Sequence, residues 1–162
     1  MIILGIDPGI GRCGWGIITV SASKLKVQKY GCIETSPRKD TAKRLEEIHS
    51  KVLSLIRDYS PDTLAIEELF FNTNAKTAFV VGQARGVILL AASQSNIPIV
   101  IYTPLQVKLS LTGYGRAEKQ QMGQMVKTLL SLKEIPKPDD TADALAIAIT
   151  HAFSYKASEY SK

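Results

Sequence analysis

The stretch that decides the fold runs from residue 2 to residue 9 and reads Ile-Ile-Leu-Gly-Ile-Asp-Pro-Gly. A continuous apolar run of this length is typical of a central strand that is buried on both faces. The run ends at Asp7, and the Pro-Gly pair that follows breaks the strand. A carboxylate at the end of a buried strand loses solvation, so it needs a compensating charge. Asp7 is therefore either a simple turn residue or part of a ligand site at the sheet edge.

Three more carboxylates stand at the ends of apolar segments. Glu67 ends a short apolar run, and Asp140 and Asp143 lie at the start of a long apolar, helix-like stretch. Because Asp140 and Asp143 are three residues apart, a helix would place them on one face. The alternative for Asp140, and for Asp139 beside it, is helix capping. Acids that three segments deliver to one point would form a site for hard cations, and their oxygen ligands suit Mg²⁺ or Mn²⁺.

The acid at position 67 has a neighbour of the same kind, Glu68. Adjacent residues of a strand point to opposite faces of a sheet, so only one of the two faces a site beside Asp7. The spacing of the residues leaves this choice open.

Glycine is frequent around Asp7, at positions 5, 9, 11, 14 and 16. The spacing of these glycines differs from that of a P-loop. We expect them to keep the neighbourhood of Asp7 open to a bulky substrate.

The remaining hydrophobic pattern predicts one α/β domain. Three β-rich segments come first, and helical periodicity then alternates with short strands. The predicted strands cover residues 2–7, 14–20, 25–35, 63–67 and 99–102, and the predicted helices cover residues 41–59, 75–95, 104–111, 117–130 and 141–155. This order implies a five-stranded mixed sheet with helices on both faces. We expect the domain to cover residues 1–155 and a polar tail to cover residues 156–162.

The composition is that of a globular protein with a basic excess. The chain has 162 residues, of which 45% are hydrophobic and 22% are charged, with a net charge of +5 and a pI of about 9.2. No apolar run is long enough to span a bilayer and no signal peptide stands out, so we expect a cytoplasmic protein without membrane contact. Cys13 and Cys32 lack metal-ligand spacing and are expected to be reduced thiols. The basic excess indicates either a polyanionic partner or only a solvated surface.

Aromatic and basic residues flank the acidic segments. Phe70 and Phe71 follow the glutamate pair and are either core residues or, on a loop, residues that stack on unpaired bases. The basic residues that surround these segments, each of which taken singly is typical of a surface charge, are Lys76, Arg85, Lys108, Arg116 and Lys119. We expect His49 and His151 to be structural.

Five stretches of the chain together resemble the RuvC family of bacterial Holliday-junction resolvases. They are Ile-Leu-Gly-Ile-Asp-Pro-Gly at 3–9, Ala-Ile-Glu at 65–67, Gly-Gln-Ala-Arg-Gly at 82–86, Ala-Glu-Lys at 117–119 and Ala-Asp-Ala-Leu-Ala-Ile-Ala-Ile-Thr-His at 142–151. Each stretch is weak evidence by itself, but all occur in the family's order and reach to about residue 155. The resemblance implies a ribonuclease-H-like fold, a homodimer and Mg²⁺-dependent nicking of four-way DNA junctions in recombination and repair. It also implies the branch-migration proteins RuvA and RuvB as partners.

The resemblance assigns roles to individual positions. Its metal-binding and catalytic acids fall on Asp7, Glu67, Asp140 and Asp143. The resemblance thus selects Glu67 over Glu68 as the acid of the site. Glu68 stands at a position where some relatives carry an uncharged residue. The resemblance further implies that Phe70 stacks on bases near the crossover and that Lys108 and Lys119 lie near the scissile phosphate. The other residues that we expect to contact DNA are Phe71, Lys76, Arg85 and Arg116.

These roles predict phosphodiester hydrolysis with two Mg²⁺ ions per site, for which Mn²⁺ would substitute. Asp7 is expected to bridge the ions, and the products would carry 5′-phosphate and 3′-hydroxyl ends. Without metal, repulsion among the acids is expected to raise at least one pKa. The helix over residues 75–95 is a candidate dimer interface, because Gly82 and Gly86 would permit close approach; the alternative is that this face packs on its own sheet.

Other functions are alternatives to junction cleavage. A related ribonuclease-H-like nuclease would act on structured RNA. A non-catalytic junction-binding protein is disfavoured, because acids add nothing to the binding of a polyanion. An actin-like or sugar-kinase-like ATPase also begins with a strand, an Asp and glycines, but those folds duplicate this unit, and 162 residues lack the second half.

Overall fold

The structure is a computed structural model that describes residues 1–21, 24–68 and 75–160. At its centre lies a five-stranded sheet with the strand order β3-β2-β1-β4-β5. The strands are β1 (Ile2–Asp7), β2 (Arg12–Ser21), β3 (Lys24–Glu34), β4 (Thr63–Glu67) and β5 (Ile99–Tyr102). The first three strands pair antiparallel, whereas β4 pairs parallel with both β1 and β5. The predicted mixed sheet and ribonuclease-H-like fold are confirmed.

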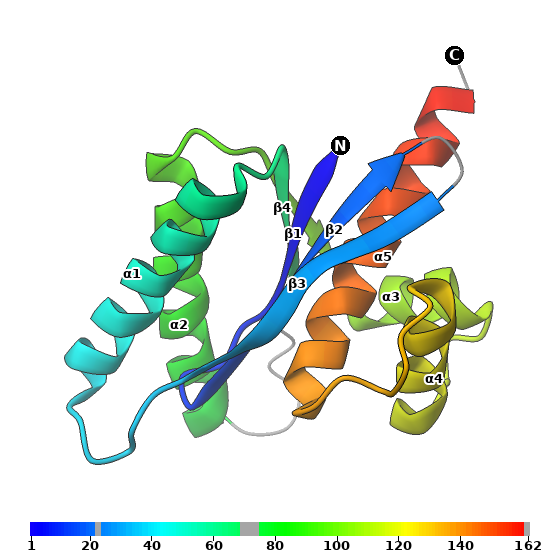
Figure 1. Cartoon of the computed structure of the whole chain (residues 1–162). Helices are drawn as coiled ribbons and strands as arrows, with labels where there is room; N and C mark the ends of the chain where they lie inside the picture. Colours follow the sequence, from blue (N-terminus) through cyan, green and yellow to red (C-terminus); the bar gives the residue numbers. More distant parts are fainter. Residues whose placement is uncertain (22–23, 69–74, 161–162) are drawn as a thin grey trace.

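Helices cover both faces of the sheet, as predicted. They are α1 (Thr41–Tyr59), α2 (Ala75–Gln94), α3 (Pro104–Thr112), α4 (Lys119–Leu129) and α5 (Asp139–Tyr160). Figure 1 shows α1 and α2 on one side of the sheet and α5, with α3 and α4 beyond it, on the other. Each face therefore has its own hydrophobic core. Across the described part of the chain, no helix is both long and apolar enough to cross a membrane.

The main differences from the predicted bounds lie at β2, α4 and α5. β2 begins at Arg12, two residues before the predicted start. α4 begins two residues later than predicted, where the Gln121 side chain accepts a hydrogen bond of 2.9 Å from the backbone N–H of Glu118. α5 is longer at both ends than the predicted helix over residues 141–155. Asp139 and Asp140 are not N-cap residues, but both lie in the first turn of α5, where the capping alternative also expects acids. Negative charge is favoured there by the helix dipole.

Both histidines join neighbouring elements. His49 Nε2 lies 2.9 Å from Gln94 Oε1, which connects α1 to α2. His151 Nδ1 lies 2.8 Å from the Tyr102 hydroxyl oxygen, which connects α5 to β5. Both contacts agree with the structural roles that we expected.

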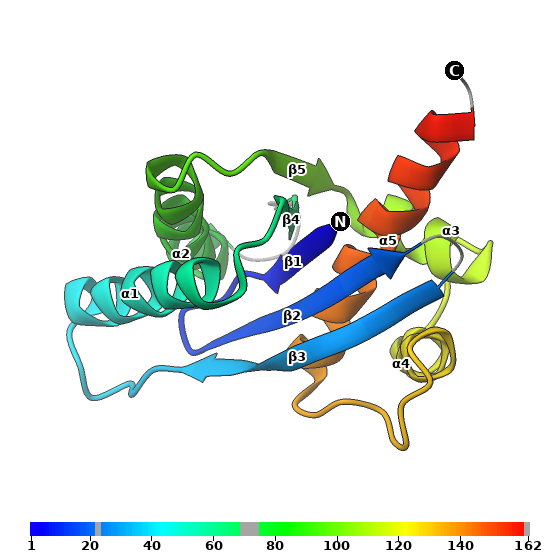
Figure 2. The ribbon, with the colours of Figure 1, turned by 45° about the horizontal axis from the view of Figure 1, so that its top comes forward.

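Helix α5 packs directly on the backbone of β1 and β2, as Figure 2 shows from a second angle. A Cβ atom on Gly5 would lie 2.2 Å from the carbonyl oxygen of Ala144, and one on Gly14 would lie 1.9 Å from that of Asp140. A Cβ on Gly16 would lie 2.4 Å from Leu145 Cδ2. These distances are far too short for any side chain, so glycine alone permits the contact. Our expectation that these three glycines keep space for a substrate is wrong, because the space is filled by α5.

We expect Gly5→Ala to lower the free energy of unfolding by about 1–3 kcal/mol, the usual range for overpacking a close contact. Gly11→Ala is the matched control, because its Cβ would meet only Arg44 Nη2 at 3.6 Å, an ordinary contact. Urea unfolding of both variants measures the difference. Equal stability of Gly5→Ala and wild type would contradict the packing described for α5.

Candidate active site

Three elements bring their acids to one edge of the sheet. Asp7 ends β1, and Glu67 ends β4, which runs parallel to β1 with Ile66 beside Ile6. Asp7 also lies opposite Gly14 of β2, and Gly14 is the residue on which the backbone of Asp140 packs. The first turns of α5 are thereby held against the end of β1. The topology therefore gathers the acids that the sequence singled out.

Two partly buried acids, Asp7 and Glu67, show strongly shifted pKa values. Burial, helped by repulsion from Glu67, Asp143 and Asp140, raises the pKa of Asp7 from 3.8 to about 8, and the nearby Lys119 opposes this rise. Burial also raises the pKa of Glu67 from 4.5 to about 7, with Asp143 adding to the shift and Lys108 opposing it. Desolvation and like-charge repulsion both disfavour the ionised forms. The site is thus short of positive charge, as expected for the acids without metal.

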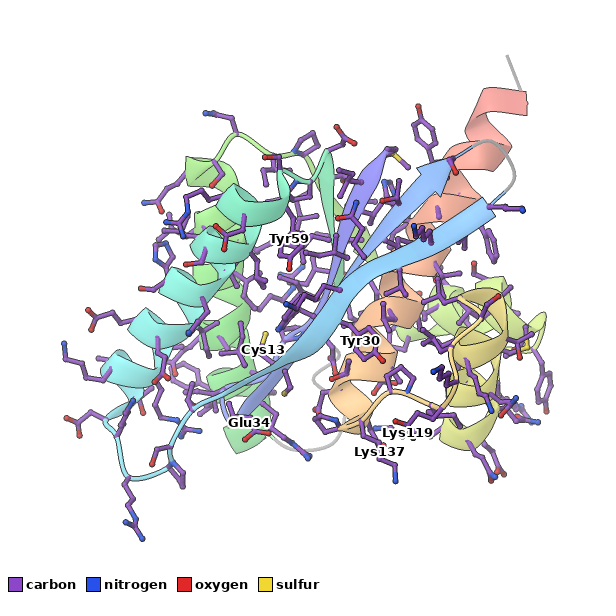
Figure 3. The ribbon with its side chains drawn as sticks, in the orientation of Figure 1. Cys13, Tyr30, Glu34, Tyr59, Lys119 and Lys137 are labelled. Carbon is purple, nitrogen blue, oxygen red and sulfur yellow. The ribbon has the colours of Figure 1, made fainter. Side chains whose placement is uncertain are left out.

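Two basic residues pair with the acids of α5. Arg12 Nε lies 3.2 Å from Asp140 Oδ2. Lys119 Nζ lies 3.2 Å from Asp143 Oδ2 and 3.4 Å from Asp139 Oδ2, and Figure 3 shows this lysine next to the start of α5. Each acid of the predicted pair on α5 therefore has a positive charge beside it.

In the ion pair of Lys119 with Asp143, burial and the partner's charge shift the pKa of each residue in opposite directions. Burial raises the pKa of Asp143, and the adjacent ammonium of Lys119 opposes that rise. Burial lowers the pKa of Lys119, but the carboxylates of Asp143 and Asp139 outweigh it, so the net shift is upward. Lys119 is therefore held in its charged form.

Asp140 is incompletely satisfied in spite of its partner. Its Oδ2 atom is buried and accepts no hydrogen bond within the described part of the chain, although Arg12 Nε lies 3.2 Å away. Nor do any three His, Cys, Asp or Glu side chains among the described residues lie close enough together to enclose a metal ion. The acids are electrostatic neighbours, and those of α5 are turned towards their basic partners.

A pocket of about 250 Å³ opens beside the acids. Glu67, Asp143, Lys108 and Lys119 line it together with apolar residues of α3, α4 and α5. Arg85 of α2 donates from Nε to the backbone oxygen of Glu67 at 3.3 Å, which ties α2 to the end of β4. The pocket thus combines acids that suit a cation with lysines that suit a phosphate.

The other predicted site residues either do not line this pocket or lie outside the part of the chain that the structure describes. Glu68 and Arg116 are exposed. Phe70 and Phe71 lie outside the described residues, as does the side chain of Lys76 near the start of α2.

Sequence reasoning missed Arg12. A signal for it exists, because Arg12 and Gly14 are two residues apart in one strand and so share a face. Gly14 is opposite Asp7, which places Arg12 on the face of the acids.

Residues 3–151 match the family model described as crossover junction endodeoxyribonuclease RuvC. Proteins of that name from Desulforamulus reducens and Alkaliphilus oremlandii are 56% and 57% identical to this chain over 152 residues, which in each case cover 94% of this chain and 93% of the relative. The structure of Thermus thermophilus RuvC in complex with Holliday junction substrate is similar with a TM-score of 0.93 at 40% identity, covering 98% of this chain and 96% of that chain. The chain therefore belongs to the RuvC family of crossover junction endodeoxyribonucleases.

Proposed function

We propose that this chain resolves four-way (Holliday) DNA junctions in recombination and repair by paired, symmetric nicks. One observation carries the proposal: the acids of β1, β4 and α5 meet beside a lysine-lined pocket in a chain of the RuvC family. A related protein of the same fold has been solved with a Holliday junction substrate. We also propose that the protein is cytosolic, the location expected from its sequence, and we take RuvA and RuvB as its partners because the family resemblance implies them.

We further propose that Asp7, Glu67, Asp140 and Asp143 hold two Mg²⁺ ions, for which Mn²⁺ would substitute. The chemistry of the donor set fits such ions, because it includes a buried carboxylate oxygen without a hydrogen bond among the described residues and two acids whose pKa values are raised by burial and repulsion. The described acids do not enclose an ion as they stand, so their side chains would have to turn towards it on binding. All four side chains offer the oxygen ligands that Mg²⁺ prefers. Two bound Mg²⁺ ions would supply an activated water and stabilise charge on the leaving oxygen.

The chain's own residues would bind and orient the phosphate. Lys108 and Lys119 line the pocket next to Glu67 and Asp143, so their ammonium groups are placed to neutralise phosphate charge in the transition state. We assign DNA contacts outside the pocket to Phe70, Phe71, Lys76, Arg85 and Arg116. Cleavage would leave 5′-phosphate and 3′-hydroxyl ends.

Symmetric cutting requires two sites related by a two-fold axis, which a homodimer supplies. We propose α2 as the interface, because one face of it presents apolar residues to solvent. Phe79 is 68% exposed and Leu90 is 50% exposed. Gly86, between them, has no atom within 4 Å of a Cβ built on it. The face that carries Gly86 therefore does not pack on the sheet of its own chain.

Asp7→Asn is expected to bind a four-way junction but to cut it at least about a hundredfold more slowly, the scale for losing one group that stabilises charge in a transition state. Glu67→Gln should behave alike. Glu68→Gln is the matched control and should cut normally, because Glu68 is exposed. Cleavage of a labelled junction in Mg²⁺ measures all three variants.

A structured RNA is compared with the junction in the same assay. Preference of the wild-type protein for the RNA would replace the proposed substrate. Full cleavage by Asp7→Asn would overturn the proposed role of the acids.

The raised pKa of Asp7 predicts a pH dependence of stability in EDTA. Because the folded protein resists ionisation of Asp7, this carboxyl destabilises the fold wherever it would be ionised in the unfolded chain. Well below pH 3.8 it is protonated in both states, so the effect is absent; it grows as pH rises and is complete above about pH 8. Asp7→Asn lacks this titration, so its stability relative to wild type should increase over this range. Urea unfolding between pH 5 and 9 measures the difference, and Mg²⁺ at pH 8 should stabilise the wild type more than the variant. Parallel pH profiles would contradict the burial of Asp7.

Leu90→Asp is expected to convert the dimer to a monomer, because a charge would be buried in the α2 interface. Leu109→Asp is the matched control, since Leu109 is 46% exposed on α3, away from α2. Sedimentation velocity measures the molecular mass of both. A dimer that survives Leu90→Asp would place the interface elsewhere.

A further inference from the structure

Arg12 approaches the acid cluster from a strand that contributes no acid to it. It opens β2 opposite Glu34 of β3, a residue that Figure 3 labels at this end of the sheet. Its Nε atom lies 3.2 Å from Asp140 Oδ2. The side chain is 59% exposed, so Arg12 reaches the buried oxygen from the rim of the site.

The position of Arg12 conflicts with cation binding at the same atom. Asp140 Oδ2 is the buried oxygen that accepts no hydrogen bond among the described residues, and it is the atom nearest to the guanidinium. A divalent cation and a guanidinium repel each other, and the two do not share one carboxylate oxygen without a large loss of Coulomb energy. Binding of a metal by Asp140 Oδ2 and pairing of this oxygen with Arg12 are therefore alternatives.

We propose, on the basis of the function proposed above, that Arg12 is a positioning residue that changes partner from Asp140 to a DNA phosphate. Without metal it neutralises Asp140. When Asp140 serves as a metal ligand, Arg12 is released at the rim of the site.

A phosphate suits the released side chain. The guanidinium carries five N–H donors in a planar fork that matches phosphate oxygens, and an arginine cannot lose its charge by deprotonation. Arg12 of β2 pairs with Asp140 as Lys119 of α4 pairs with Asp143, so each acid of α5 has its own cation. The exchange would make metal binding and DNA binding strengthen each other, and such coupling is reciprocal.

The first test measures metal affinity without DNA. We expect Arg12→Gln to bind Mn²⁺ about two- to fivefold more tightly than wild type by isothermal titration, the range that corresponds to losing a partly exposed competing ion pair. Arg12→Lys keeps the charge and should restore most of the competition. Arg57→Gln is the matched control, because it breaks an exposed ion pair with Asp58 on α1 and should leave Mn²⁺ affinity unchanged. A merely structural role, in which Arg12 holds Asp140 in place for the metal, predicts weaker binding by Arg12→Gln instead.

The second test measures junction binding against salt concentration by fluorescence anisotropy. With Ca²⁺ present, Arg12→Gln should lower the slope of log affinity against log salt by about 1, the change expected for one lost phosphate contact. In EDTA the slope should equal that of wild type, because Arg12 is then paired with Asp140. If Arg12→Gln and wild type have the same slope in Ca²⁺ as well as in EDTA, the proposed exchange of partners is wrong.

The experiments distinguish failure of the proposed function from failure of the proposed role of Arg12. If wild type does not cut a junction in Mg²⁺, the proposed function is wrong, whereas the Mn²⁺ titration still decides whether Arg12 competes for Asp140. If wild type cuts the junction but Arg12→Gln binds Mn²⁺ no more tightly than wild type, the role of Arg12 is wrong and the proposed function stands.

Discussion

The direct contact of α5 with the glycine backbone of β1 and β2 is the constraint on which the site depends. Asp140 and Asp143 belong to the first turns of α5, whereas Asp7 belongs to the sheet. Any side chain at Gly14 would collide with the backbone of Asp140 itself and push the helix away from the sheet. The acids are therefore brought together by the absence of side chains beside them. Close packing of this kind is rigid, because protein interiors transmit strain instead of absorbing it.

This packing gathers like charges at a place where water is largely excluded. Burial, which is the larger cause, and the resulting repulsion together raise the pKa values of Asp7 and Glu67. Two separate cores, one on each face of the sheet, stabilise the fold against that repulsion. Destabilised clusters of this kind are common where a protein prepares a binding site, because the ligand supplies the missing charge.

The sequence pattern predicted the fold better than it predicted the contacts within the site. β1, β4, β5 and α1 have the predicted bounds, because periodicity and the Pro and Gly breaks act locally. Distances between elements are not local, so the glycines of β1 and β2 were misinterpreted and Arg12 was overlooked. The choice between Glu67 and Glu68 also needed more than spacing. Resemblance to a family selected Glu67, and the structure places Glu67 at the pocket and Glu68 in solvent.

The charge distribution of the chain leads to one more consequence. The net charge of +5 favours approach of a polyanion such as DNA, whereas the acid cluster would repel the phosphate that is cut in the proposed reaction. Lys108, Lys119 and Arg12 lie at the boundary between these two regions. Two of them, Lys119 and Arg12, are paired with acids of α5, so they are available to DNA only to the extent that those acids find another counter-charge. On the function proposed here, attraction to DNA would therefore precede metal binding, whereas close approach of the scissile phosphate would depend on it.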